Sequence, residues 1–213
     1  MIFRTAILMT LTLLAACAPV TQTDTASFTD PAWRGRSFSA LLIQVDKSSL
    51  QEQQAIESAA SQKLKLAGID ASAGSEFFPP TRNYNPSARK HILRQTNAEG
   101  VVVVTPTEKH TVQRYIPPSY NAGLSYPITR ADGRVGYVHQ PGFYDPGFVL
   151  TEPRASYDVA LYSLPNYTKV WTAEFRVAGT NGMSFTTVGE HFGAELVKRL
   201  AQDGLISPQK NTH

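Results

Sequence analysis

The chain has 213 residues, of which 42% are hydrophobic and 17% are charged, enough apolar material for one domain with a substantial core. Its single cysteine excludes an internal disulfide and any zinc site that needs two thiolates. The formal net charge is only +3 and no basic run occurs, so no nucleic-acid partner is expected.

The chain opens with a short apolar segment. Arg4 supplies a positive charge, and the apolar stretch Ala6–Ala16 follows it. At 1.5 Å per helical residue this stretch is too short to span a hydrocarbon core of roughly 30 Å. We therefore predict that residues 1–16 form a signal peptide that is removed from the mature protein.

The end of this segment, Leu14-Ala15-Ala16-Cys17, resembles the lipobox of bacterial lipoprotein signal peptides. The resemblance implies cleavage before Cys17, lipidation of its thiol and acylation (palmitate) of the new amino terminus, so that the lipid holds the protein on a membrane. Ala18 stands where an Asp would favour retention, which implies an outer-membrane lipoprotein facing the periplasm if the host is Gram-negative. The alternative is an ordinary secretory signal with a cysteine nearby by chance.

Composition divides the rest of the chain into three parts. Residues 17–36 are rich in Thr, Ser, Asp and Pro and predict a flexible tether, although Phe28 and Trp33 could dock on the domain. A single globular domain is expected over 37–206 and a disordered tail over 207–213.

The first half of the domain alternates strand and helix signals. Ser49 begins a capping box, and Asn85 before Pro86 is a typical helix start. The run VVVVT is typical of a central strand covered on both faces. The predicted elements are strands at 39–45, 69–78 and 101–105, and helices at 50–67 and 86–100.

The amino-acid composition changes between residues 117 and 153, where six of the 14 prolines fall. This density predicts a long ordered loop or an irregular hairpin. Residues 156–164 and 169–178 then alternate and predict an antiparallel hairpin, and the capping-box spacing of Thr187 and Glu190 opens a last helix that ends near Gly204.

This element order predicts an α+β (or α/β) two-layer sandwich, with a mixed sheet of about four to five strands, three helices and a long Pro/Tyr-rich loop. The order, the VVVV strand and the VWTAEF strand resemble the periplasmic domains of the curli-export and penicillin-binding-protein-activator lipoproteins, and related lipoprotein families of unknown function, over about residues 38–205. The resemblance implies a fold and assigns no functional residue.

Motifs of catalysis are missing from the sequence. It has no HExxH, no GxSxG elbow and no phosphate-binding GxxxxGK[ST] loop, and its one thiol is assigned to lipid. We therefore expect no enzyme activity, no catalytic residue, no cofactor and no metal.

The long loop carries the candidate binding residues, because Tyr and Arg are favoured at interface hot spots. We predict a partner surface that an envelope protein would contact, formed by Tyr115, Tyr120, Tyr126, Arg130, Arg134, Tyr137 and Tyr144. Alternatively, the aromatic side chains stack on peptidoglycan or another small ligand. A third possibility is that they pack beneath the loop and fix it to the sheet.

Overall fold

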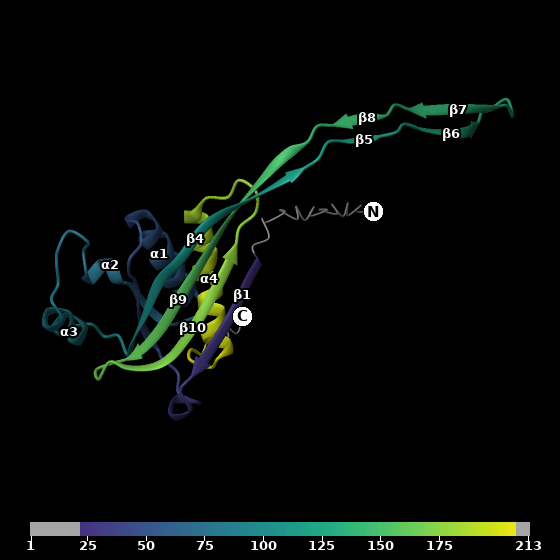
Figure 1. Cartoon of the computed structure of the whole chain (residues 1–213). Coiled ribbons are helices and arrows are strands. Elements are labelled where there is room, and N and C mark those ends of the chain that lie inside the picture. The colour runs from purple at the N-terminus through teal and green to yellow at the C-terminus, as the bar shows by residue number, and fades with distance from the viewer. Residues whose placement is uncertain (1–21, 208–213) are drawn as a thin grey trace, which may run out of the picture.

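The structure is a computed structural model that describes residues 22–207. The predicted signal peptide, the predicted lipidation site Cys17 and residues 208–213 lie outside the described residues. Helices pack on a twisted sheet to form the globular part, and a long two-stranded arm projects from one end of that sheet (Figure 1).

Six strands form the central sheet in the order β1–β10–β9–β4–β2–β3. β2 pairs in parallel with β3 and β4, whereas the other neighbours are antiparallel. The strands are β1 (Gln22–Thr29), β2 (Ala40–Val45), β3 (Asp70–Ala73), β4 (Gly100–Ile116), β9 (Phe148–Ser163) and β10 (Thr168–Ala178). The predicted mixed α+β sheet is confirmed, but it has more strands than the predicted four to five, and the described residues form four α-helices instead of the predicted three.

The additional strand is β1, which lies in the segment whose composition predicted a tether. It pairs with β10 along its whole length, and a 3-10 turn (Pro31–Trp33) follows it. Trp33 then stacks on Phe38 with ring centroids 5.8 Å apart. Residues 22–33 are therefore ordered in the structure, in contrast to the flexible segment predicted there.

Two long helices, α1 (Leu50–Leu66) and α4 (Phe185–Gln202), pack on each other and on one face of the sheet. Their apolar side chains share the main core with Tyr157 and Phe175, whose rings lie 4.1 and 5.1 Å from the ring of Phe192. Gly193 lets the helices approach closely, because a Cβ there would lie 3.1 Å from the backbone nitrogen of Ala60.

The opposite face of β2 and β4 is covered by α2 (Gly74–Phe77) and α3 (Pro86–Gln95). Leu42 and Val101 point to this side and form a second small core with Phe78 and Leu93. The predicted two-layer sandwich therefore has a third, partial layer. The predicted strand 69–78 is shorter than expected, because the chain turns at Gly74, where a Cβ would lie 2.9 Å from the carbonyl oxygen of Ile43.

Helix starts follow the capping chemistry of the sequence at α1 and α3. The side chains of Ser49 and Asn85 accept hydrogen bonds from the backbone N–H groups of Glu52 and Ala88, as predicted. The start of α4 differs, because Ser184 rather than Thr187 is its cap and accepts from the Thr187 N–H.

Candidate functional site

The most unusual surface of the protein is an arm, defined here as residues 112–152, that leaves the end of the sheet (Figure 1). The predicted loop or irregular hairpin is a β-hairpin: β4 and β9 stay paired from Val112–Glu152 to Ile116–Phe148. Two further ladders continue it, β5 (Ser119–Asn121) with β8 (Phe143–Asp145) and β6 (Leu124–Thr129) with β7 (Val135–Gln140). At about 3.3 Å per residue the arm extends up to about 60 Å.

Prolines and glycines divide the arm into these three ladders. Proline has no N–H for a ladder, and Pro117, Pro118 and Pro141 fall in the gaps between the paired strands. We call these gaps joints. Gly142 lies in the joint between β7 and β8, and Gly147 lies in the joint between β8 and β9. A Cβ on them would lie 2.7 Å from the carbonyl oxygen of Asn121 and 2.8 Å from a ring carbon of Pro118. Most of the prolines that argued against regular structure thus lie at the joints of a segmented ribbon, whereas Pro127 lies within β6.

A tight turn closes the arm at its far end. The backbone N–H of Arg130 donates to the carbonyl of Arg134 over 2.8 Å, and the N–H of Gly133 donates to the carbonyl of Arg130 over 2.9 Å. Gly133 has a φ of 79°, the left-handed conformation that such hairpin turns require, and the Asp132 carboxylate accepts from the N–H of Arg134. Gly133 and the Asp132 side chain thus build the geometry of the turn.

Register places the predicted site residues on both faces of the arm. Tyr126 lies opposite Val138, and it shares its face with Leu124 and Ile128, whereas Tyr137 lies opposite Pro127 on the other face. Nearer the base, Tyr120 and Tyr144 form a directly opposed cross-strand pair. The predicted residues therefore share one ribbon and do not converge on one point.

The aromatic side chains of the arm face solvent. Tyr126 is 44% exposed and Tyr137 is 74% exposed, so packing beneath a loop, one of the alternatives from sequence, is wrong. Twelve of the fifteen exposed large hydrophobic side chains of the described residues belong to the arm. They are Tyr115, Tyr120, Leu124, Tyr126, Ile128, Val135, Tyr137, Val138, Phe143, Tyr144, Phe148 and Val149.

Charge is sparse on the arm beyond Arg114 and Glu152 at its base. Between residues 115 and 151 the charged side chains are Arg130, Asp132, Arg134 and Asp145, and the first three lie in the turn. Arg130 packs over Gly136, and the guanidinium of Arg134 lies 3.9 Å from the Asp132 carboxylate. The two predicted arginines therefore mark the end of the arm, beyond an aromatic band in which Asp145 is the only Asp, Glu, Lys or Arg.

An ion pair between a half-buried lysine and a buried glutamate joins the base of the arm to the helices, and no local sequence pattern marks it. Lys109 follows a β-bulge in β4 and contacts the carboxylate of Glu52 on α1, which is 3% exposed. The Tyr157 hydroxyl donates to the same carboxylate over 3.3 Å. Burial, and next the charge of Glu52, raise the pKa of Tyr157, so this hydroxyl keeps its proton and remains a donor.

The described residues contain neither a candidate metal cluster nor a candidate membrane-spanning helix. Over residues 22–207, no cluster of three or more His, Cys, Asp or Glu side chains could hold a metal ion. Within the same range, no helix is both long enough and apolar enough to cross a bilayer.

No family model and no curated protein matches the chain. Similar solved structures include a PelC dodecamer from Paraburkholderia phytofirmans, 17% identical over 89% of this chain and 100% of that chain, with a TM-score of 0.47. Lipoprotein GNA1162 from Neisseria meningitidis is 16% identical over 77% of this chain and 99% of that chain, with a TM-score of 0.39. Both TM-scores lie below 0.5, so the function is inferred below from the residues of this chain.

Proposed function

We propose that this protein is a lipid-anchored, non-catalytic envelope lipoprotein that binds another envelope protein through its arm. The observation that carries the proposal is the arm itself, a two-stranded ribbon that exposes twelve large aromatic and aliphatic side chains and has most of its charges at its base and in its turn. Such a surface is costly in water, and a contiguous apolar patch of this kind is typical of an interaction site.

The architecture of the arm favours a bound state. An isolated two-stranded ribbon is marginally stable in water, because it has no core of its own. A protein partner could cover one face of the arm and bury Tyr126 with its apolar neighbours Leu124, Ile128 and Val138. Tyrosine suits this role because it buries a large area at a small cost in side-chain entropy.

The extended shape of the arm favours a protein partner over a sugar or a small ligand. Small ligands bind in concave sites that surround most of their surface. Five pockets of the described residues are lined entirely by residues outside the arm. The arm is instead an extended ribbon with two open faces, which suits a second extended surface.

The anchor and the arm base are close together in this proposal. Gln22, where β1 begins, pairs with Ala178, which in turn pairs with Arg154 at the base of the arm. The chain from Cys17 to Gln22 spans at most about 17 Å. A lipid on Cys17 would therefore hold the arm base near the bilayer surface, and Ala18 favours the outer membrane of a Gram-negative host.

Site-specific photocrosslinking in intact cells tests the partner. We would place a photoreactive phenylalanine analogue at Tyr126 or at Tyr144, with Gln54 on the exposed side of α1 as the matched control position. One envelope protein captured at both arm positions and absent at Gln54 is the expected result. Equal capture at all three positions, or capture of nothing, contradicts a protein partner on the arm.

Two further measurements separate the remaining alternatives. Fractionation of cells that make Cys17→Ser tests the anchor: the variant should leave the membrane fraction, and a membrane-bound variant contradicts lipid anchoring. Co-sedimentation with purified cell-wall sacculi tests the wall-binding alternative. Binding that is lost in Tyr126→Ser/Tyr144→Ser would assign the arm to the wall instead of to a protein.

A further inference from the structure

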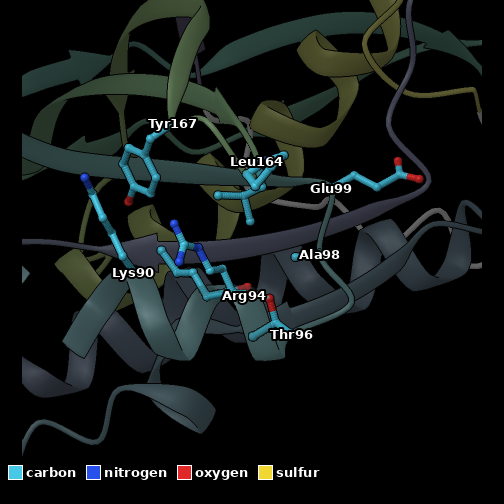
Figure 2. Close-up of a pocket in the computed structure, with 9 residues that line it drawn as sticks. Lys90, Arg94, Thr96, Ala98, Glu99, Leu164 and Tyr167 are labelled. Carbon is cyan, nitrogen blue, oxygen red and sulfur yellow. Dashed lines mark hydrogen bonds between the residues drawn. The ribbon is translucent and has the colours of Figure 1, made fainter. Parts of the chain in front are cut away.

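A pocket at the opposite end of the sheet from the arm has the features of a ligand site. It has a volume of about 320 Å³ and lies between α3, the segment that follows it and the turn joining β9 to β10 (Figure 2). Its apolar lining comes from Leu93, Ala98, Leu164 and Pro165. This combination of an apolar floor and a polar rim is the usual composition of a small-molecule site.

The rim of the pocket is positively charged. Lys90 and Arg94 lie one turn apart on α3 and both line it (Figure 2). Among residues 22–207 neither side chain forms an ion pair, whereas the neighbouring Arg89 lies over the ring of Phe78 with its guanidinium carbon 5.5 Å from the centroid. Two adjacent cations without a carboxylate partner are suited to bind an anion.

The one acidic residue that lines the pocket does not neutralise these cations. The carboxylate of Glu99 accepts hydrogen bonds from the backbone N–H and the hydroxyl of Ser39, over 2.7 and 2.9 Å. Figure 2 shows the Glu99 side chain directed away from Lys90 and Arg94. The bond from the Ser39 N–H lowers the pKa of Glu99, so this carboxylate remains charged and stays hydrogen-bonded to Ser39.

Tyr167 completes the pocket in a strained conformation. Its φ is 61°, in the left-handed region that an aromatic residue rarely adopts. This backbone conformation puts its ring at the pocket, stacked on Tyr162 with centroids 5.1 Å apart. Burial raises the pKa of Tyr167, so the hydroxyl keeps its proton and can donate to a ligand.

From these features we infer that the pocket binds a small soluble organic anion, a carboxylate or phosphate joined to a compact apolar group. The anionic end would contact Lys90 and Arg94, and the apolar group would lie on Leu93 and Leu164. Register places the pocket, beside Leu164, at the end of β9 and β10 far from Gln22 and the arm. A soluble ligand therefore fits this position better than a lipid of the anchoring bilayer, and the site does not depend on the function proposed for the arm.

Fluorine NMR of three matched probes tests the inference with the mature lipoprotein in phospholipid nanodiscs, and empty nanodiscs serve as the blank. The probes are 4-fluorophenylacetate, 4-fluorobenzyl phosphate and the neutral 4-fluorophenylacetamide. We expect at least one anionic probe to bind at least tenfold more tightly than the amide. The preferred anion then distinguishes a carboxylate ligand from a phosphate ligand.

Variants locate the binding. Lys90→Gln/Arg94→Gln should weaken binding of the preferred anion at least tenfold, whereas Lys63→Gln/Lys65→Gln removes the same charge from α1 and should leave affinity unchanged. Ala98→Leu fills the pocket without altering charge and should also abolish binding, with the urea midpoint measured to confirm folding. No anion binding above the blank, equal binding of the amide, or equal losses in both double variants would overturn the inference.

Discussion

Replacing Lys109 with Met perturbs the contact that fixes the base of the arm to the helices. Met keeps most of the apolar stem and removes the charge, so Glu52 is left as a carboxylate that is 3% exposed and has lost its cation. Tyr157 still donates to that carboxylate. The structure therefore predicts destabilisation by an uncompensated charge rather than by lost packing.

The size of the effect follows from the burial of the two partners. Removing one partner of a fully buried ion pair costs about 3–5 kcal/mol. The Lys109 side chain is 31% exposed, so water can reach part of the vacated position, and we expect about 2 kcal/mol. With an m-value of about 2 kcal/mol/M, the urea midpoint should fall by about 1 M.

A second substitution separates charge from packing. In Glu52→Gln/Lys109→Met the amide oxygen can still accept from Tyr157 and no charge is buried, so most of the lost stability should return. Lys198→Met is the matched control, because its ammonium pairs with Glu195 at 3.1 Å on an exposed helix face and should cost less than about 0.5 kcal/mol.

Equilibrium urea unfolding, followed by circular dichroism, measures all four proteins. An unchanged slope is needed to assign the shift to stability alone. A Lys109→Met midpoint equal to that of Lys198→Met, or a double variant no more stable than Lys109→Met, would refute the buried-charge reasoning.

Three other substitutions give equally direct tests. The Ser39 N–H lowers the pKa of Glu99, so the stability advantage of wild type over Glu99→Gln should be full above about pH 5 and shrink as pH falls to about 3, which urea midpoints at both pH values measure. Gly193→Val places a side chain against the α1 backbone and should cost about 1–3 kcal/mol, a fall in Tm of several degrees; an unchanged Tm would contradict the close helix contact. Asp203→Asn weakens the acceptor that Trp171 Nε1 and a β1 serine share, so hydrogen exchange should accelerate in β1 first, and uniform acceleration across the sheet would contradict this.

The parts of the fold that the sequence predicted well are those with local signals. Ser49 and Asn85 cap the predicted helices because capping satisfies backbone N–H groups within three residues. The VVVVT run lies in β4, with Val101 and Val102 buried against opposite layers. In both cases the chemistry that selects the structure is contained in a few neighbouring residues.

β1 could not be predicted in the same way, because its inward positions are polar. The alternate residues Thr23, Thr25 and Ser27 are half-buried, so no apolar alternation marks the strand. Ser27 instead donates to Asp203, far along the chain, over 2.5 Å and accepts from Arg199. A pattern of hydrophobicity does not report a strand that is held by its backbone ladder and by hydrogen bonds to distant residues.

The candidate sites show the same division. Sequence selected the aromatic residues of the arm, but their distribution over two faces depends on the register, which the turn at Gly133 determines. The pocket beside Tyr167 was missed because three separate segments line it. Lys90 and Arg94, four residues apart on one helix without an acidic partner at that spacing, were the only local signal for it.

The arm poses a question that folding alone does not answer. Its large side chains add nothing to the main core, so the globular part does not need them to fold. A ribbon that served only as a spacer would be more soluble with charged residues at positions such as Tyr126 and Tyr144, because free edges and apolar faces promote aggregation. The prolines at its joints limit pairing along those edges while leaving the aromatic faces open. Edges on which strand addition is limited, combined with exposed aromatic faces, suit a surface that binds one partner through its side chains.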